Sequence, residues 1–240
     1  MQIVYEDNHL IVVSKTCHEI VQGDKTGDEP LGETLKRLIK ERDQKPGNVF
    51  LGVTHRLDRP TTGVVIFAKT SKALERINRM FAEGKVHKTY WCIVQNVWID
   101  ADRQAAGSKN KRPLPEKEAD LTHWLVRNEK QNRSVAFDRE VPNSKEARLH
   151  YRVIASTDRY ALLEVQLFTG RHHQIRCQLS HIGLPIKGDL KYGFPRSNPD
   201  GGISLHSRKV NFVHPVSKVD TFIEAPVPDD NLWRALTSQL

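Results

Sequence analysis

The chain has 240 residues, of which 38% are hydrophobic and 28% charged, so it holds enough apolar material to bury a core and is not a disordered chain. Lysine and arginine outnumber aspartate and glutamate by 37 to 29, and the formal net charge of +8 favours a polyanionic partner. Three cysteines at wide spacing form no disulfide framework, and no apolar run approaches the roughly 20 residues that span a bilayer. The N-terminus has no targeting pattern, so we expect a reducing, cytoplasmic location.

Apolar periodicity predicts a hairpin and then a helix at the start of the chain. Residues 3–5 and 10–13 read as strands on either side of a turn at Asp7-Asn8. Apolar residues at helical spacing over 31–39 predict a helix, with Asp28 as its cap and Pro30 in its first turn.

The next segment predicts two strands, at 49–53 and 64–67, with Asp58 on the turn between them. A helix should then begin at the capping residue Ser71 and end at Gly84. Its outer face carries Lys72, Arg76 and Arg79. We expect that face to be solvated and basic.

The rest of the chain is rich in strands. Residues 88–94 resume a strand, and 101–120 read as an exposed loop or insertion that does not mark a domain boundary. Later elements are predicted as strands at 121–126, 147–155, 160–167, 204–213 and 219–223 and as helices at 172–181 and 231–239. Strands outnumber helices without regular alternation, so we expect a single α+β domain over 1–240, with a mixed, largely antiparallel sheet and flanking helices.

Two segments concentrate the residues that carry chemistry. Residues 55–63 read His-Arg-Leu-Asp-Arg-Pro-Thr-Thr-Gly, and residues 169–176 read Thr-Gly-Arg-His-His-Gln-Ile-Arg. By itself, an Arg and Asp pair on a turn is usually a surface ion pair, and Thr-Gly-Arg is an ordinary helix start. Other short segments accompany them: Lys88-Thr89-Tyr90, residues 145–151, 183–189, Tyr192-Gly193 and 205–207.

In this order, these segments resemble the RluA family of pseudouridine synthases, over about residues 4–222. The departures from the family pattern are Thr16 for proline, Thr62 for serine and Leu149 for threonine. The sequence opens at the catalytic-domain hairpin, without the small basic S4 domain that many relatives carry in front. The resemblance implies one pseudouridine synthase catalytic domain with a central RNA-binding cleft.

The reaction that the resemblance implies needs only side chains. The bond from ribose C1′ to uracil N1 breaks, the base turns, and C1′ joins C5, with no redox change and no group donor. A carboxylate suits this chemistry because it can attack or stabilise an oxocarbenium-like C1′. The resemblance assigns Asp58 as nucleophile, Arg176 as the cation that keeps it ionised, and Tyr90 as the residue that stacks on uracil. Attack at C1′ and elimination to a glycal both remain open.

The substrate implied by the resemblance is a uridine in structured ribosomal or transfer RNA, and the base must leave its stack before it can react. Arg56 is then the wedge that occupies the vacated space. We expect His55, Arg171 and His173 to contact RNA as well, with His173 also ordering the loop around Arg176. No Gly-rich nucleotide fingerprint occurs, so we expect no cofactor, and we expect a monomer without DNA or membrane partners.

Three other readings compete with this one. Helical spacing places His173, Cys177 and His181 along one face, as metal ligands could be, but the sequence suggests no fourth ligand and we expect no metal site. A protein could also keep the scaffold and bind RNA without catalysis, or an aspartate nucleophile could hydrolyse free nucleosides. The joint presence of Asp58, Tyr90 and Arg176 favours catalysis, and the basic composition favours RNA as the substrate.

Overall fold

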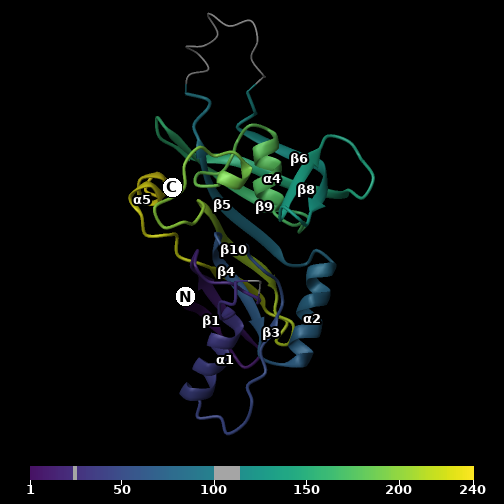
Figure 1. Cartoon of the computed structure of the whole chain (residues 1–240). Helices are drawn as coiled ribbons and strands as arrows, with labels where there is room; N and C mark the ends of the chain where they lie inside the picture. Colours follow the sequence, from purple (N-terminus) through teal and green to yellow (C-terminus); the bar gives the residue numbers. More distant parts are fainter. Residues whose placement is uncertain (24–25, 100–113) are drawn as a thin grey trace, which may run out of the picture. The chain divides into compact units, whose positions relative to one another are not determined.

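The computed structural model describes residues 1–23, 26–99 and 114–240 (Figure 1). Contacts between residues divide it into two units. The first unit comprises residues 1–89, 200–202 and 206–227, and the second comprises residues 90–199, 203–205 and 228–240. None of the helices within these described ranges is long and apolar enough to cross a membrane.

The first unit is built on a mixed sheet. Its strands lie in the order β1 (Gln2–Glu6), β2 (Leu10–Lys15), β4 (Thr62–Ala68) and β10 (Leu205–Val213), with β3 (Gly52–Val53) paired to β4 and β11 (Asp220–Glu224) paired to β10. The β4–β10 pair is parallel and the other pairs are antiparallel. The predicted fold class, α+β with a mixed, largely antiparallel sheet, is confirmed.

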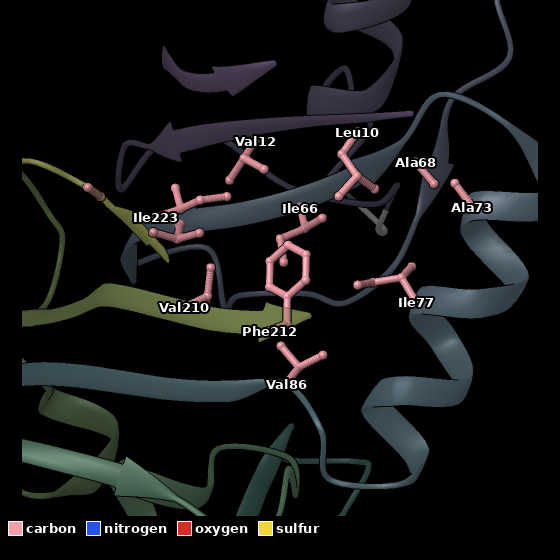
Figure 2. Packing of buried hydrophobic residues seen from close by; sticks show 12 residues of the cluster. Leu10, Val12, Ile66, Ala68, Ala73, Ile77, Val86, Val210, Phe212 and Ile223 are labelled. Atoms are coloured by element: carbon pink, nitrogen blue, oxygen red, sulfur yellow. The ribbon is translucent and has the colours of Figure 1, made fainter. Parts of the chain in front are cut away.

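Two helices cover opposite faces of this sheet, because successive strand residues point to alternate sides. On one face α1 (Leu31–Arg42) packs against Ile11 and Phe67 through Leu35. On the other, Ala73 and Ile77 of α2 (Ser71–Ala82) face strand residues, with Ile66 and Phe212 among them (Figure 2). Each such fully buried aliphatic or aromatic side chain contributes about 1.5–3 kcal/mol through removal from water.

The second unit carries a sheet in the order β5 (His87–Gln95), β9 (Tyr160–Leu167), β8 (Lys145–Ser156), β6 (Glu118–Asn128) and β7 (Arg133–Phe137). Strand β5 begins in the first unit and enters the second at Tyr90. Helix α4 (Gln174–His181) contacts β6 and β7, and its Cys177 shares a core with Leu125, Ala136, Ala147 and Tyr192. The short 3₁₀ helix η1 (Leu190–Tyr192) follows, and α5 (Asn231–Thr237) ends the described chain.

The two predicted helix caps are wrong. Pro30 occupies the N-cap of α1 without a side-chain bond, and Asp28 instead forms an ion pair with Arg59 at 2.6 Å. Thr70 rather than Ser71 caps α2, since the Thr70 hydroxyl accepts a hydrogen bond from the Ala73 N–H. Asp28 pairs with Arg59 instead of capping α1, and α2 begins one residue earlier than a cap at Ser71 requires.

Some strand boundaries also differ from the prediction. The strand at 49–53 is only Gly52–Val53, and β7 was not predicted. The predicted loop at 101–120 lies mostly outside the described residues, but 118–120 belong to β6. These polar residues pair with β8 on a sheet face that is open to solvent, so they lack the apolar signal of a buried strand.

Gly63 lies where β4 approaches β10 most closely. Its φ is +107°, and a methyl group added there would lie 2.7 Å from the Ser207 backbone nitrogen and would collide with the Ser207 carbonyl oxygen. Only glycine combines this backbone conformation with this contact. The beginning of β4, just after Asp58, is therefore fixed against β10.

We expect Gly63→Ala to lower the free energy of unfolding by about 2 kcal/mol or more, because backbone atoms must move to admit the methyl group. Gly84→Ala is the matched control, since Gly84 also has a positive φ of +70° but open space around it. That control should cost about 1 kcal/mol. Urea denaturation of both variants measures the difference, and equal losses would contradict the role given to the Ser207 contact.

Candidate active site

Asp58 lies in the first unit on the connection between β3 and β4. The Thr61 N–H donates to the Asp58 carbonyl oxygen at 3.0 Å, which closes a tight turn, and the Asp58 residue is partly exposed. The predicted position on a turn between two strands is therefore confirmed. Asp58 thus lies, partly exposed, on a loop whose backbone is ordered by its own hydrogen bond.

Lys15, the last residue of β2, is hydrogen-bonded to the backbone of this loop. It is 1% exposed, and its ammonium donates to the carbonyl oxygens of Thr16 at 2.7 Å and Arg59 at 2.8 Å. Burial lowers the pKa of Lys15 to about 8, while the nearby acidic groups, Asp58 among them, oppose that shift. A buried lysine thus fixes the carbonyl next to Asp58 and places positive charge near its carboxylate.

Two histidines make further polar contacts at the ends of the Asp58 loop. The ring Nε2 of His55 accepts a hydrogen bond from the Ile66 N–H at 3.1 Å, and its ring lies against Phe81 with centroids 5.0 Å apart. Burial, with a smaller contribution from Lys88, lowers the pKa of His55 to about 3, so this ring is neutral and carries its proton on Nδ1. At the other end of the loop, Thr62 Oγ1 lies 2.8 Å from His206 Nδ1.

The arginines on either side of Asp58 have different surroundings. Arg59 is held by Asp28 and Thr26, each at 2.6 Å. The exposed guanidinium of Arg56 donates to a neutral acceptor, Gln22 Oε1, at 3.2 Å. Arg56 therefore has the accessibility that a wedge into RNA requires.

Arg176 lies in the second unit, on the first turn of α4, in a buried bidentate ion pair. Its Nε and Nη2 donate to the two carboxylate oxygens of Asp189 at 2.7 and 2.9 Å, and the two side chains are only 5% and 1% exposed. The guanidinium lies 5.1 Å from the ring centroid of Tyr192. This fork-to-fork geometry fixes the plane of the Arg176 guanidinium.

The loop before α4 is ordered by Gln174, the first residue of that helix. Its Oε1 accepts hydrogen bonds from the Arg171 N–H at 2.9 Å and from the Thr169 hydroxyl at 2.8 Å. Its amide nitrogen donates to the Arg148 carbonyl at 3.0 Å. Arg171 itself is exposed, and its Nε donates to the Glu146 carbonyl, which aims this cation outward from a rigid loop.

His173 and Tyr192 connect this loop to Arg176. His173 is 8% exposed, adopts a left-handed conformation with φ of 53°, and places Nδ1 3.0 Å from the Tyr192 hydroxyl. The same hydroxyl accepts the Ser134 N–H at 2.8 Å, and burial raises the pKa of Tyr192 to about 12. These contacts support the ordering function expected of His173 more than direct contact with RNA.

The structure thus brings the expected site residues together in two sets. The first unit holds Asp58, Arg56 and His55 around one loop, and the second holds Arg176, Arg171 and His173 around another. Tyr90 lies in the second unit on β5 and is 6% exposed. Sequence reasoning gave no role to Lys15, Asp189 or Tyr192, although each belongs to a segment that resembles the family.

The hypothesis of a metal site at His173, Cys177 and His181 is wrong. Cys177 packs in an apolar core, and Nδ1 of His173 faces the Tyr192 hydroxyl. His181 lies beside Asp138, with 2.7 Å between its Nε2 and the Asp138 carboxylate. Helical spacing alone does not predict a shared ligand, because α4 is largely buried and these three residues contact different neighbouring elements.

Lys15→Met should slow the expected formation of pseudouridine at least about tenfold, because the Asp58 loop loses the ammonium group bonded to it. Methionine has a similar length, so the change removes the charge and the hydrogen bonds with little loss of packing. In the wild type, the rate should also fall as pH rises through about 8, where Lys15 loses its charge. Between about 8 and the ordinary value of 10.5, the unfolded chain binds more protons than the folded one, so stability rises over this window while the rate falls.

Single-turnover rates against pH, with denaturation curves at each pH, separate the two effects. Lys69→Met is the matched control, since Lys69 also donates to a backbone carbonyl, that of Asp7, and lies in the same unit. It should lower stability but leave the rate and its pH profile unchanged. An alkaline decline that persists in Lys15→Met would show that another group titrates.

Comparisons with known proteins agree with this geometry. Residues 9–181 match the family model described as RNA pseudouridylate synthase. The chain is 30% identical over 260 residues to tRNA pseudouridine synthase C of Vibrio cholerae serotype O1, an alignment that covers 100% of this chain and 95% of the relative. It is 31% identical over 241 residues to ribosomal large subunit pseudouridine synthase C of the same organism, covering 98% of this chain and 68% of the relative.

The fold is also that of solved synthase structures. Human RNA Pseudouridylate Synthase Domain Containing 4 superposes with a TM-score of 0.73 over 95% of this chain and 89% of that one, at 23% identity. This likeness concerns the fold alone. Together with the matched family model and the full-length relatives, the signatures around Asp58 and Arg176 identify the chain as a member of the RluA family of RNA pseudouridylate synthases.

Proposed function

We propose that this isomerase converts specific uridines of structured ribosomal or transfer RNA to pseudouridine, with Asp58 as its nucleophile and with base flipping. Family membership supplies the reaction, from uridine to pseudouridine in RNA. The observation that carries the proposal for this chain is the Asp58 loop, whose Arg59 carbonyl is bonded to the buried ammonium of Lys15. A reacting carboxylate needs this combination of accessibility and a fixed backbone.

In this proposal Asp58 acts at ribose C1′ as the bond to N1 breaks, either by attack or by stabilising the charge that leads to a glycal. A carboxylate enclosed with its substrate stays ionised only when cations or hydrogen-bond donors favour the charged form. Lys15 supplies positive charge from within the first unit. We assign the second cation to Arg176.

The buried ion pair with Asp189 supports that assignment. A guanidinium this buried needs a partner, and the bidentate pair uses its Nε and Nη2 while fixing the direction of the whole plane. The pair therefore holds the Arg176 guanidinium in one orientation within the second unit. Tyr90 is assigned to stacking on the uracil, and its low exposure supports a role inside an enclosed site.

Reaching C1′ requires the target nucleotide to leave its stack, at a cost of a few kcal/mol. We assign Arg56 to the vacated space, where a planar cation can stack and bond phosphate. The exposed Arg171 is assigned to the RNA backbone. His55 has one ring nitrogen engaged with the Ile66 N–H, so any contact with RNA uses Nδ1–H.

We also propose that the enzyme acts as a cytoplasmic monomer. Its three cysteines are buried free thiols, which fits a reducing compartment. The relatives reported above are named for transfer RNA and for large-subunit ribosomal RNA, and both remain candidate substrates. A scaffold that only binds RNA and a hydrolase of free nucleosides are the competing functions.

Mapping pseudouridine in total RNA from cells with and without the gene tests the proposal. One or a few uridines should lose the modification completely and regain it when the wild-type gene is restored, and the RNA that holds them names the substrate. An unchanged map would contradict catalysis. Release of free uracil by the purified protein would favour the hydrolase instead.

Arg56 and Arg176 should fail in different ways although they carry the same charge. Arg176→Met should abolish chemistry and spare RNA binding, because Asp58 loses a cation in a desolvated site. Arg56→Ala should lower the rate of pseudouridine formation on a rigid stem-loop by about a hundredfold. The few kcal/mol needed to flip the base out of its stack are then no longer offset by Arg56.

Single-turnover rates on a rigid stem-loop, and on a variant whose target uridine is unpaired and mobile, separate the two arginines. The mobile substrate should restore much of the rate of Arg56→Ala and none of the rate of Arg176→Met. Arg59→Ala serves as a control for loss of positive charge on the same loop. Equal rescue of both variants, or of neither, would show that the roles are wrongly assigned.

A further inference from the structure

His123, Asp138 and His181 form a cluster in the second unit that lies outside the residues assigned to catalysis. They come from β6, from the residue that follows β7, and from the last position of α4, which lies over the sheet in Figure 1. One ligand atom of each residue lies within 4.8 Å of the other two, and among the described residues no other group of three or more such side chains meets this condition. The cluster therefore joins three separate elements at a single point.

Asp138 and His181 form a hydrogen bond in this structure, and the spacing of the three donor atoms also leaves room for a metal ion among them. The Asp138 Oδ1 atom lies 2.7 Å from His181 Nε2 and 3.7 Å from His123 Nε2. In a tetrahedral zinc site with bonds of about 2.0–2.2 Å, ligand atoms are separated by about 3.3–3.5 Å. These two separations lie on either side of that value, and the separation between the two histidine ligand atoms is no more than 4.8 Å. Asp138 is 83% exposed, so its carboxylate can shift to equalise them.

The surroundings of the cluster also favour a cation. His181 ends α4, where the carbonyl groups of the last turn carry partial negative charge. The Asp138 carboxylate adds a full negative charge. His123 is 8% exposed, whereas His181 is 31% exposed, so the site opens to water on one side. Water can complete the coordination there.

Gln178 contacts the ring nitrogen of His123 that faces away from the cluster. Its Nε2 lies 3.0 Å from His123 Nδ1 and 3.1 Å from the Ala147 carbonyl, while its Oε1 is buried without a hydrogen-bond partner. In this orientation His123 accepts at Nδ1 and keeps its proton on Nε2. If the amide turns over, Oε1 accepts the Nδ1–H proton and the Nε2 lone pair becomes available to a metal, at the cost of the bond to Ala147.

We propose that His123, Asp138 and His181 bind a divalent transition metal of the zinc class, with water as the remaining ligand. Two imidazoles and one carboxylate form a donor set that such ions prefer. The metal braces the C-terminal end of α4 against β6 and β7. It takes no part in the isomerisation, so the inference stands independently of the proposed function.

A second histidine cluster in the same sheet provides a matched control. His150 lies 3.0 Å from Asp120 through Nδ1 and 3.2 Å from Glu118 through Nε2. These two carboxylates contact opposite nitrogens of one ring, so they cannot share an ion with it. His150→Gln should therefore leave metal binding unchanged, although it removes a histidine that also sits beside acidic groups.

The test uses the full chain without a polyhistidine tag, stripped with chelator and titrated with zinc chloride by calorimetry. Cobalt chloride replaces zinc for absorption spectra, which report a tetrahedral site directly. The wild type should bind one zinc ion with a Kd of about 10 μM or tighter, and its midpoint of thermal unfolding should rise by about 2 °C or more at saturation. Asp138→Asn should weaken binding at least about tenfold, as loss of a ligand does.

The double variant with Asp138→Asn and His181→Gln should show neither the calorimetric signal nor the cobalt bands. Asp138 is exposed, so the single variant is expected to fold and to report on the metal even if the double variant is unstable. Wild-type protein that binds neither ion saturably, or an Asp138→Asn variant that binds zinc as tightly as the wild type, would overturn the proposal. Parallel loss in His150→Gln would overturn it as well.

Discussion

The hydrogen bond from the buried ammonium of Lys15 to the Arg59 carbonyl is the contact on which the proposed chemistry depends most. Removing an ammonium group from water costs several kcal/mol unless hydrogen-bond acceptors and negative charges are supplied to it. Here two carbonyl oxygens and the nearby acidic groups offset part of that cost, although burial still lowers the pKa of Lys15 to about 8. The same ammonium therefore fixes the backbone beside Asp58, and its positive charge favours the ionised form of the Asp58 carboxylate.

The second unit also contains a buried cation, Arg176, which is stabilised by the carboxylate of Asp189. Arg176 is buried with Asp189, and the Tyr192 ring, itself held by His173 and Ser134, lies beside the guanidinium. In both units a buried cation is held by polar partners, the Thr16 and Arg59 carbonyl oxygens for Lys15 and the Asp189 carboxylate for Arg176. Removing either partner of a buried ion pair leaves an uncompensated charge, which is why such positions tolerate little change.

Periodicity in the sequence was enough to predict most of the strands, the four α-helices of the described residues and the fold class, because burial of alternate strand residues and of one helix face leaves a local signal. The motif residues of the two signatures could also be named, with Asp58 on its turn. Lys15 and Asp189 received no role because their partners, Arg59 and Arg176, are brought to them only by tertiary folding. A local sequence pattern carries no record of such contacts.

The same limit explains the errors. The cap assigned to Asp28 failed because Arg59 competes for its carboxylate. Strand β7 was missed because it is five residues long and exposes Val135 to solvent, which weakens the alternation that marks a buried strand. Spacing grouped His181 with its helix neighbours, whereas its real partners, His123 and Asp138, lie on other elements.

The central claim is that Asp58 carries the reaction, and loss of tritium from C5 of uridine measures it most directly. RNA labelled at C5 releases tritium to water only when C5 bonds to C1′ and then loses its hydrogen. Under single-turnover conditions the wild type should release one equivalent, whereas Asp58→Asn, which keeps the shape of the side chain, should release none while binding the same RNA. Appreciable release by Asp58→Asn at wild-type affinity would contradict the assignment of Asp58 as nucleophile.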